Sequence, residues 1–400
     1  MPNIPNYEKR DPAPQYQEPL SPEESQKLIQ VPAGFELKLF ASEPEIINPI
    51  AMNWDEKGRL WVVETVDYPN TVRNDNGTGD DRIKICEDTN GDGKADKFTV
   101  FAENLNIPTS FTFANDGIII SQAPDFLFLK DTDGDDKADV RKVIINGWGT
   151  FDTHAGPSNL QRGIDNKIYG VVGYSGFKGD IGGKNYDFGQ AVYRFEPNLS
   201  DFEVVSSTSN NTWGLGFTEE NSLFASTANN THSVFVGIPN ADFEGVEGIP
   251  KEGNRKIDGH YAMHPITSHV RQVDVFGGFT AAATAGHHFY TARDYPSSYW
   301  DQVAFVCEPT GHLVHMARIG RDGAGYSESD GWNLFAGADE WVAPVAAQVG
   351  PDGAVWVLDW YNFIIQHNPT PTDERGGYDA ETGKGNAYVN PLRDKSRGRV

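Results

Sequence analysis

Two acidic loops of equal length carry the side chains that are best suited to hold a metal ion. The first reads Asp88-Thr-Asn-Gly-Asp-Gly-Lys-Ala-Asp96 and the second reads Asp131-Thr-Asp-Gly-Asp-Asp-Lys-Ala-Asp139. Both offer oxygen side chains at positions 1, 3, 5 and 9 and a backbone carbonyl at position 7, the spacing with which a tight loop surrounds a hard cation such as Ca²⁺. The predicted calcium ligands are Asp88, Asn90, Asp92, Lys94, Asp96, Asp131, Asp133, Asp135, Lys137 and Asp139, the two lysines through their carbonyls.

The surroundings of these loops favour a structural site between two strands. A helix–loop–helix calcium site ends on a glutamate at position 12, where this chain has Thr99 and Lys142. Apolar segments of strand character flank both loops, so we expect a strand–loop–strand setting. The alternative is a pair of Asp- and Gly-rich turns whose side chains cap their own backbone without a metal ion.

A histidine two residues after an aspartate is the strongest candidate for catalysis. Asp152-Thr-His154 opens a stretch that contains Arg162 and then leads into an apolar strand. An imidazole at the mouth of a channel can act as a general base near neutral pH. The predicted catalytic residues are therefore His154, Asp152 and Arg162. His154 could instead simply form a hydrogen bond across a turn, and both interpretations stay open on sequence alone.

A repeated unit must position these residues. Six times a turn with Gly or Asn leads into a short apolar strand, which begins at Leu60, Ile118, Ile168, Leu223, Val303 and Val355. The starts lie 58, 50, 55, 80 and 52 residues apart, and the longest interval holds an insertion at about 237–271. Units of roughly 40–50 residues that each form a small sheet are typical of propeller blades. The predicted fold class is all-β, a six-bladed β-propeller over residues 31–400 with calcium-binding strand–loop–strand insertions.

We expect the repeated strand to be the innermost strand of each blade, ending at a central funnel. The funnel would then gather Glu64, Gln122, Tyr174, Thr227, Glu308 and Asp359. His367, which follows an aromatic pair, is expected to line the same funnel. The predicted cofactor-binding residues are Asn211, Glu308, Asp359 and Glu64.

Composition fits a turn-rich protein that does not bind nucleic acid. The 400 residues include 42 Gly and 24 Pro, and 57 acidic against 33 basic residues give a net charge of −24. This charge argues against nucleic acid and anionic lipid as partners, and no apolar run reaches the ~18–20 residues that span a bilayer. The first residues lack the apolar segment of a signal peptide, so either the protein stays inside the cell or an export signal has been removed. Residues 1–30 are Pro-rich and polar and predict an extended arm.

Several long phrases resemble the N-terminal propeller of the PVC-type membrane-bound dehydrogenases. They are Val31-Pro-Ala-Gly-Phe-Glu-Leu, Leu60-Trp-Val-Val-Glu-Thr-Val-Asp-Tyr-Pro, the two acidic loops, Asp152-Thr-His154, Glu308-Pro-Thr-Gly-His-Leu-Val-His and Gly350-Pro-Asp-Gly-Ala-Val-Trp-Val-Leu-Asp-Trp-Tyr. Members often continue into helical repeats and a CxxCH cytochrome module, so the resemblance implies a fragment whose electron acceptor is a cytochrome c. Together with the acidic exterior, it implies a periplasmic or extracellular location.

That family is in turn similar to the soluble glucose and sorbosone dehydrogenases, six-bladed propellers that hold pyrroloquinoline quinone (PQQ). In those enzymes a histidine within H-x-G-x-L-x-x-G-x-D-x-x-I/L-Y removes the proton of the sugar hydroxyl, and His154 with Asp165 to Tyr169 matches this pattern. The resemblance implies that His154 is the base while a hydride passes to the quinone. Two positions depart from the pattern: Asn210 stands where an arginine lies over the quinone, and Tyr174 stands where an aspartate lies beside calcium.

Three classes of function remain open. The first is a calcium-binding oxidoreductase of the sugar/sorbosone dehydrogenase type that oxidises a carbohydrate or related alcohol with PQQ. The second is a metal-dependent lactonase or hydrolase, in which the four predicted cofactor-binding residues hold a channel cation that polarises an ester carbonyl. The third is a non-catalytic glycan-binding propeller that uses Trp61, Trp213 and Trp356 as platforms.

Overall fold

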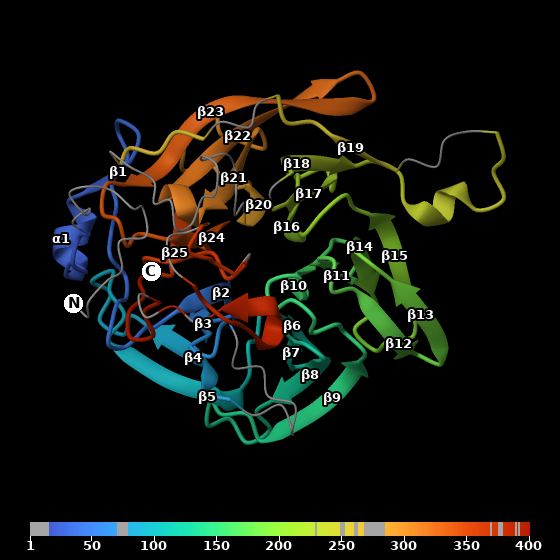
Figure 1. Ribbon diagram of the computed structural model, residues 1–400, viewed down its shortest axis with the longest axis horizontal. Coiled ribbons are helices and arrows are strands. Elements are labelled where there is room, and N and C mark those ends of the chain that lie inside the picture. Colours follow the sequence, from blue (N-terminus) through green and yellow to red (C-terminus); the bar gives the residue numbers. More distant parts are fainter. Residues whose placement is uncertain are drawn as a thin grey trace.

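The computed structural model consists of short antiparallel β-sheets that stand radially around one axis (Figure 1). It describes residues 16–69, 79–228, 230–248, 253–259, 263–267, 285–368, 370–374, 379–388, 390 and 393–400. The all-β class and the propeller arrangement predicted from the sequence are confirmed.

Five sheets have four or five strands. The first contains β2 (Pro49–Trp54), β3 (Leu60–Glu64), β4 (Asp81–Glu87) and β5 (Lys97–Leu105). The second contains β6 (Ser110–Ala114), β7 (Gly117–Gln122), β8 (Asp125–Lys130) and β9 (Val140–Asn146). The third contains β10 (Pro157–Arg162), β11 (Ile168–Val172), β14 (Ala191–Phe195) and β15 (Phe202–Ser207). The fourth contains β16 (Thr212–Phe217), β17 (Leu223–Thr227), β18 (Thr231–Val236) and β19 (Asn254–Lys256). The fifth contains β20 (Ala285–Phe289), β21 (Val303–Glu308), β22 (Leu313–Asp322), β23 (Gly325–Gly337) and β1 (Ile29–Gln30).

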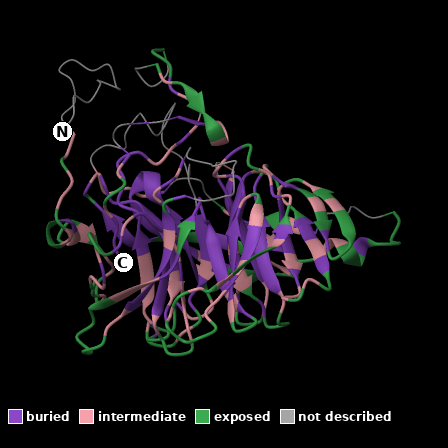
Figure 2. Ribbon diagram, turned by 90° about the horizontal axis from the view of Figure 1, so that it is seen from below, coloured by how far each residue is buried: buried purple, intermediate pink, exposed green. Residues whose placement is uncertain are grey.

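The first strand of each sheet faces the axis, and the second strand is enclosed by neighbouring sheets. First strands contact one another from sheet to sheet: β2 meets β6, β6 meets β10, β10 meets β16 and β16 meets β20. The repeated phrases form second strands, and every residue of β3, β11, β17 and β21 is buried. Figure 2 shows that buried residues fill the middle of the sheets while exposed residues gather at the turns. Because both faces of a second strand pack on apolar neighbours, its sequence is a continuous apolar run. The expectation that these phrases are innermost strands is therefore wrong by one strand.

The sixth repeat forms a two-stranded sheet instead of a full blade. It contains β24 (Pro344–Val349) and β25 (Val355–Asp359), and β24 contacts both β20 and β2. Beyond β25, isolated bridges join Asp359 to Arg399 and Arg399 to Ser42. The structure thus has five full blades where the sequence predicts six equal ones. The outer pairing at the sixth position comes from two distant segments through single residues, which a periodic sequence pattern cannot show.

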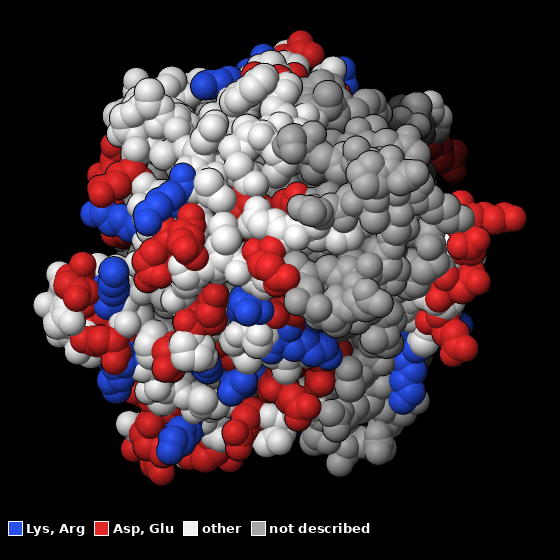
Figure 3. Space-filling view, turned by 60° about the vertical axis from the view of Figure 1, so that its left-hand side comes forward, with Lys and Arg blue, Asp and Glu red and all other residues white. Residues whose placement is uncertain are grey.

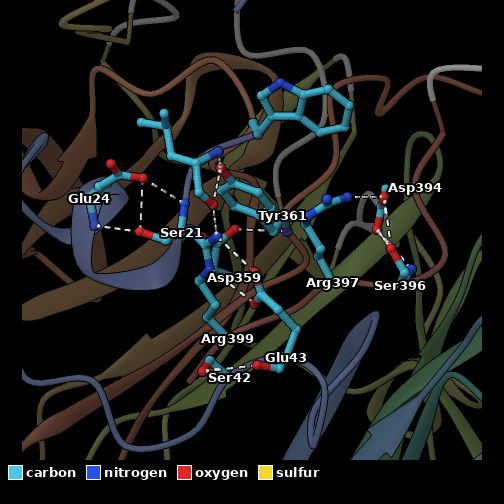
Figure 4. A network of polar contacts seen from close by, with 12 residues as sticks. Ser21, Glu24, Ser42, Glu43, Asp359, Tyr361, Asp394, Ser396, Arg397 and Arg399 are labelled. Atoms are coloured by element: carbon cyan, nitrogen blue, oxygen red, sulfur yellow. Dashed lines mark hydrogen bonds and ion pairs between the residues drawn. The ribbon is translucent and has the colours of Figure 1, made fainter. Parts of the chain in front are cut away.

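Arg399 ties these distant segments together (Figure 4). Its Nη2 donates to the Leu20 carbonyl oxygen at 2.7 Å and lies 3.0 Å from Glu43 Oε1. The centre of its guanidinium lies 3.4 Å from the centroid of the Tyr361 ring. One buried side chain therefore links the beginning of the described chain, its end and the segment after β25.

Polar residues at the ends of second strands fix the turns that enter their own sheets. Side-chain oxygens accept backbone hydrogen bonds in three sheets, Glu64 from Ile47 at 2.9 Å, Gln122 from Asn106 at 2.8 Å and Asp359 from Ala343 at 2.7 Å. In each case the donor lies 16 or 17 residues earlier in the chain. These side chains hold backbone, which explains why a polar residue ends an otherwise apolar strand.

Small elements and turns lie outside the sheets. They are α1 (Pro22–Gln26), η1 (Asn240–Phe243), η2 (Pro309–Gly311), η3 (Lys384–Asn386) and the hairpins β12 (Phe177–Ile181) with β13 (Lys184–Phe188) and β26 (Thr382–Gly383) with β27 (Ala387–Tyr388). Of the predicted arm, residues 1–15 lie outside the described residues, while α1 and β1 occupy its end. Parts of the predicted insertion at 237–271 also lie outside them.

No described helix is long and apolar enough to cross a bilayer. Figure 3 shows acidic and basic side chains interleaved on one face of the molecule.

Candidate active site

A cavity of about 130 Å³ lies on the axis, where all six first strands begin. Residues close to those starts line it: Ile50, Thr109, His154, Trp213, Ala285 and Val345. Aromatic rings make up much of the remaining wall, from Tyr68, Tyr174, Trp360 and His367. Among the described residues the wall contains no Asp, Glu, Lys or Arg. Such a wall suits a ligand that is neutral and partly apolar.

An aspartate, a histidine and a tyrosine form a chain of hydrogen bonds that reaches this cavity. Asp152 Oδ1 lies 2.9 Å from His367 Nε2, and His367 Nδ1 lies 2.8 Å from Tyr68 Oη. Because an ionised carboxylate only accepts hydrogen bonds, Nε2 of His367 donates to Asp152 and Nδ1 accepts from the tyrosine. A proton that reaches Tyr68 from the cavity can therefore move to His367, where Asp152 stabilises the resulting positive charge.

Asp152 is fully buried and collects donors from several loops. Its carboxylate accepts from His154 N at 2.9 Å, Asn368 Nδ2 at 2.5 Å and Tyr174 Oη at 3.2 Å. Burial alone would raise its pKa, but the hydrogen bond and the positive charge offered by His367 outweigh burial and hold the pKa at about 2. Asp152 is thus an anion at neutral pH and organises the loops beneath the cavity.

His154 lies in the cavity wall, flat against an indole ring. Its ring centroid is 4.6 Å from that of Trp213, with 9° between the planes. The Nδ2 of Asn211 lies 3.0 Å from His154 Nδ1. With this amide donating, Nδ1 accepts and Nε2 carries the ring proton, whereas the reversed amide would leave Nε2 as the base. Asn211 therefore selects whether the neutral ring donates or accepts at the cavity.

We expect His154 to be uncharged throughout the physiological pH range. Burial, followed by repulsion from His367, lowers its pKa to about 4, although Asp152 acts in the opposite direction. Between pH 4 and the unfolded pKa of about 6.5, His154 binds more protons in the unfolded chain than in the folded one. The free energy of unfolding therefore decreases as the pH falls through that window. NMR titration of histidine-labelled protein, with His154→Gln for assignment, measures the pKa directly. A midpoint near 6.5 would contradict the burial of this ring.

Arg162 lies at the opposite end of the axial strands from His154. It ends β10, is exposed, and donates to Asn166 at 3.3 Å. It also lines a separate cavity of about 440 Å³ at the far ends of the first strands. The structure therefore brings Asp152 and His154 together but does not bring Arg162 to them.

Of the predicted cofactor-binding residues, Asn211 alone lines the axial cavity. Glu64 and Asp359 accept the backbone hydrogen bonds described above, and Glu308 accepts from Thr310 N at 3.1 Å. Burial raises the pKa of Asp359 to about 7, while nearby Arg399 lowers it. Within the described part of the chain these carboxylates do not form a common cation site.

The acidic loops occupy the setting expected for them, between β4 and β5 and between β8 and β9. In both, the first aspartate accepts backbone hydrogen bonds, Asp88 from Gly93 at 2.8 Å and Asp131 from Gly134 at 2.7 Å. These bonds lower the pKa of both carboxyl groups. In the second loop one carboxylate oxygen each of Asp131, Asp133 and Asp139 lies within 4.8 Å of the others.

Sequence reasoning gave no role to Tyr68 or Asn368. Tyr68 lies within one of the long phrases, immediately before a proline, and Asn368 follows His367. The sequence signal that could have indicated them is the adjacent pair His367-Asn368, which follows the last repeated strand. Both contacts span more than 200 residues, since Asn368 bonds to Asp152 across 216 positions and Tyr68 bonds to His367 across 299.

Comparison with known protein families shows which family the chain belongs to. A family model described as a domain of unknown function, DUF7133, matches residues 21–400. The chain belongs to this family. No curated protein matches the chain.

Solved structures resemble this DUF7133 protein at low sequence identity. The holo form of the pyranose dehydrogenase PQQ domain from Coprinopsis cinerea is 15% identical with a TM-score of 0.51, and the match covers 86% of this chain and 95% of that one. The iodide structure of a Trichoderma reesei carbohydrate-active enzyme of family AA12 is 12% identical with a TM-score of 0.51, covering 82% and 94%. The PQQ-bound aldose sugar dehydrogenase from Streptomyces coelicolor is 14% identical with a TM-score of 0.47, covering 93% and 96%. The first two likenesses show a shared propeller fold for this chain.

Proposed function

We propose that the axial cavity binds a neutral carbohydrate or related alcohol and that the protein is an oxidoreductase of the sugar dehydrogenase type. The observation that carries this proposal is the chain from Asp152 through His367 to Tyr68, which ends in an uncharged, aromatic cavity. Aromatic faces pack against the C–H faces of sugars, while amides and hydroxyls bond to sugar hydroxyl groups. The fold shared with a pyranose dehydrogenase domain supports the same class.

The described residues would activate one substrate hydroxyl. A bound O–H group donates to Tyr68 Oη and gives up its proton as the tyrosine passes its own proton to His367 Nδ1. Asp152 stabilises the imidazolium, and its other donors keep the carboxylate in place. His154 and Asn211, which line the same cavity, would orient the neighbouring hydroxyl groups.

The described wall does not fit PQQ as a tightly held cofactor. PQQ carries three carboxylates, and burying these charges without cationic partners is unfavourable. Among the described residues the cavity offers neither Lys nor Arg, and Asn210 donates to the Ala228 carbonyl oxygen at 2.9 Å. We therefore route no step through PQQ and propose an external quinone that accepts the hydride in one two-electron step, with a cytochrome reoxidising the quinol one electron at a time.

A second candidate is metal-free hydrolysis of a sugar lactone. The same proton chain could deprotonate a water molecule in place of a substrate hydroxyl. The mismatch with PQQ favours this alternative, whereas the dispersed positions of Glu64, Glu308 and Asp359 disfavour a lactonase that uses a channel cation.

The test is a screen of aldoses, polyols and lactones with a dye acceptor, with and without added PQQ and Ca²⁺. Dye reduction that falls about 10²–10⁴-fold in Tyr68→Phe supports the oxidoreductase. Acid release without dye reduction would move the assignment to hydrolysis. Binding without turnover would leave a glycan-binding propeller. Oxidation that is unaffected by Tyr68→Phe would contradict the proton chain.

We also propose that the two acidic loops bind Ca²⁺, supported by the ligand spacing and by the cluster in the second loop. Millimolar Ca²⁺ should raise the melting temperature by several degrees, because a ligand at 100 times its Kd stabilises by about 2.7 kcal/mol. Differential scanning calorimetry after EDTA treatment measures the shift. Asp131→Asn should reduce it, whereas Asp187→Asn, on the exposed hairpin β12–β13, should not. An equal shift in both variants would contradict a site in this loop.

The remaining expectations stay proposals. We propose that β24 and β25 are completed as a sixth blade by the segments around Arg399 and Ser42, because first strands form a closed ring through β24. A periplasmic or extracellular location, a cytochrome partner and membership of the PVC-type dehydrogenases are supported by the net charge of −24 and by the shared phrases.

A further inference from the structure

Two histidines and a glutamate meet in the interior between the fourth and fifth sheets. His232 lies on β18, His315 on β22 and Glu328 on β23, and one ligand atom of each lies within 4.8 Å of the other two. Their side chains are almost fully enclosed, with exposures of 0%, 0% and 7%. None of them lines the axial cavity, so the cluster is separate from the proposed active site.

The cluster lies against an apolar interface. Phe224, Val306 and Ala317 belong to the buried hydrophobic group that joins the two sheets. The ring of His232 lies 5.3 Å from that of His315, centroid to centroid, with 73° between their planes. Placing two imidazoles and a carboxylate in such an interface costs free energy, which a bound cation would offset.

Neighbouring groups hold the ligands by their other atoms. His232 Nδ1 lies 3.2 Å from Ser233 Oγ, which in turn lies 2.8 Å from His287 Nε2. Gly259 N donates to Glu328 Oε2 at 2.9 Å, and the other carboxylate oxygen, Oε1, lies 3.9 Å from His315 Nε2. Metal-binding histidines and carboxylates are commonly oriented in this way by a second layer of hydrogen bonds.

We propose that His232, His315 and Glu328 bind a divalent transition-metal ion, for which Zn²⁺ is the best match. Imidazole nitrogens with one carboxylate suit Zn²⁺ and its neighbours, whereas Ca²⁺ and Mg²⁺ prefer oxygen ligands. Three protein ligands leave one position of a tetrahedral ion for water or another group. Since β18 belongs to the fourth sheet and β22 and β23 to the fifth, the ion would cross-link two blades.

The test is titration of the EDTA-treated full chain with Zn²⁺ in a buffer that contains excess Ca²⁺, which occupies oxygen-rich sites. Isothermal calorimetry should give one tight Zn²⁺ per chain, and Glu328→Gln should weaken it at least 10-fold. Glutamine keeps the size of the side chain and an acceptor for Gly259. The matched control is His264→Gln, which removes a partly exposed histidine paired with Asp330 and should leave the affinity unchanged.

Co²⁺ substitution keeps the proposal testable even if Glu328→Gln does not fold. Co²⁺ bound to the wild-type chain by nitrogen and oxygen ligands in a four-coordinate site should give strong visible absorption. Added Zn²⁺ should displace the Co²⁺ and abolish this absorption. Absence of tight Zn²⁺ binding by the intact chain, or equal affinity in folded Glu328→Gln, would overturn the site.

Discussion

Asp152→Ala should lower the free energy of unfolding by about 3–5 kcal/mol and abolish turnover in the axial cavity. The carboxylate is fully buried and is bonded by His367, His154 N and Asn368, so its removal leaves several buried donors unsatisfied. Denaturant unfolding followed by tryptophan fluorescence measures the loss of stability. A change below 1 kcal/mol would contradict the organising role given to this residue.

The pH dependence separates charge from packing at this position. The pKa of Asp152 is held at about 2, so its stabilising contribution is present above the unfolded pKa of about 3.9 and is lost as the pH falls toward 2. Asp152→Asn keeps the shape of the side chain and removes the charge. It should therefore differ from the wild type most at neutral pH and approach it in acid. Asp165→Asn, whose carboxylate bonds to Tyr169 Oη near the surface, is the matched control.

Arg399→Ala should destabilise the fold by a similar amount, about 3–5 kcal/mol, although it lies far from the cavity. The guanidinium is buried, bonds to Glu43 and the Leu20 carbonyl oxygen, and lowers the pKa of Asp359 (Figure 4). Its loss leaves buried carboxylates without their cation. Arg397→Ala removes a bond confined to one loop, from Arg397 to Asp394, and should cost less than about 1 kcal/mol.

The deficit of Arg399→Ala should widen above pH 7. Burial already raises the pKa of Asp359 to about 7, and without Arg399 this pKa rises further. The wild type then ionises Asp359 at a pH where the folded variant still holds the proton, and the variant continues to lose stability as the pH rises. Urea unfolding at pH 5, 7 and 9 follows this difference, and a deficit that stays constant across the three would count against an electrostatic role for Arg399.

The sequence was informative where one residue type recurs for one physical reason. The apolar runs beginning at Leu60, Ile168 and Val303 are buried on both faces, so they stood out as strands. The polar residues that end the repeated strands predict a funnel, yet Glu64 and Asp359 hold backbone amides one strand away from the axis. A pattern in one strand does not reveal which strand of a sheet lies innermost.

Only part of the candidate site could be predicted from the sequence, for a related reason. Asp152 and His154 lie close in sequence, and their proximity to the channel could be inferred from the strand that follows. Tyr68 and His367 come from loops that do not repeat, and their hydrogen bond joins positions 299 apart. The cluster of His232, His315 and Glu328 likewise depends on the packing of two sheets, which no local spacing encodes.

The single-residue pairings at Ser42, Asp359 and Arg399 have a consequence for how long the folded chain survives. A closed ring cannot shed a blade from its middle without first breaking open somewhere. The four-stranded sheets are held by ladders of several residues, whereas β25 meets the segments around Arg399 and Ser42 only through isolated bridges, so local opening is easiest in this sheet. We expect amide hydrogen exchange to be fastest in β24 and β25 among the axial strands. The rate at which proteases degrade the protein would then depend on local opening near Ser42 and Arg399, more than on global unfolding of its core.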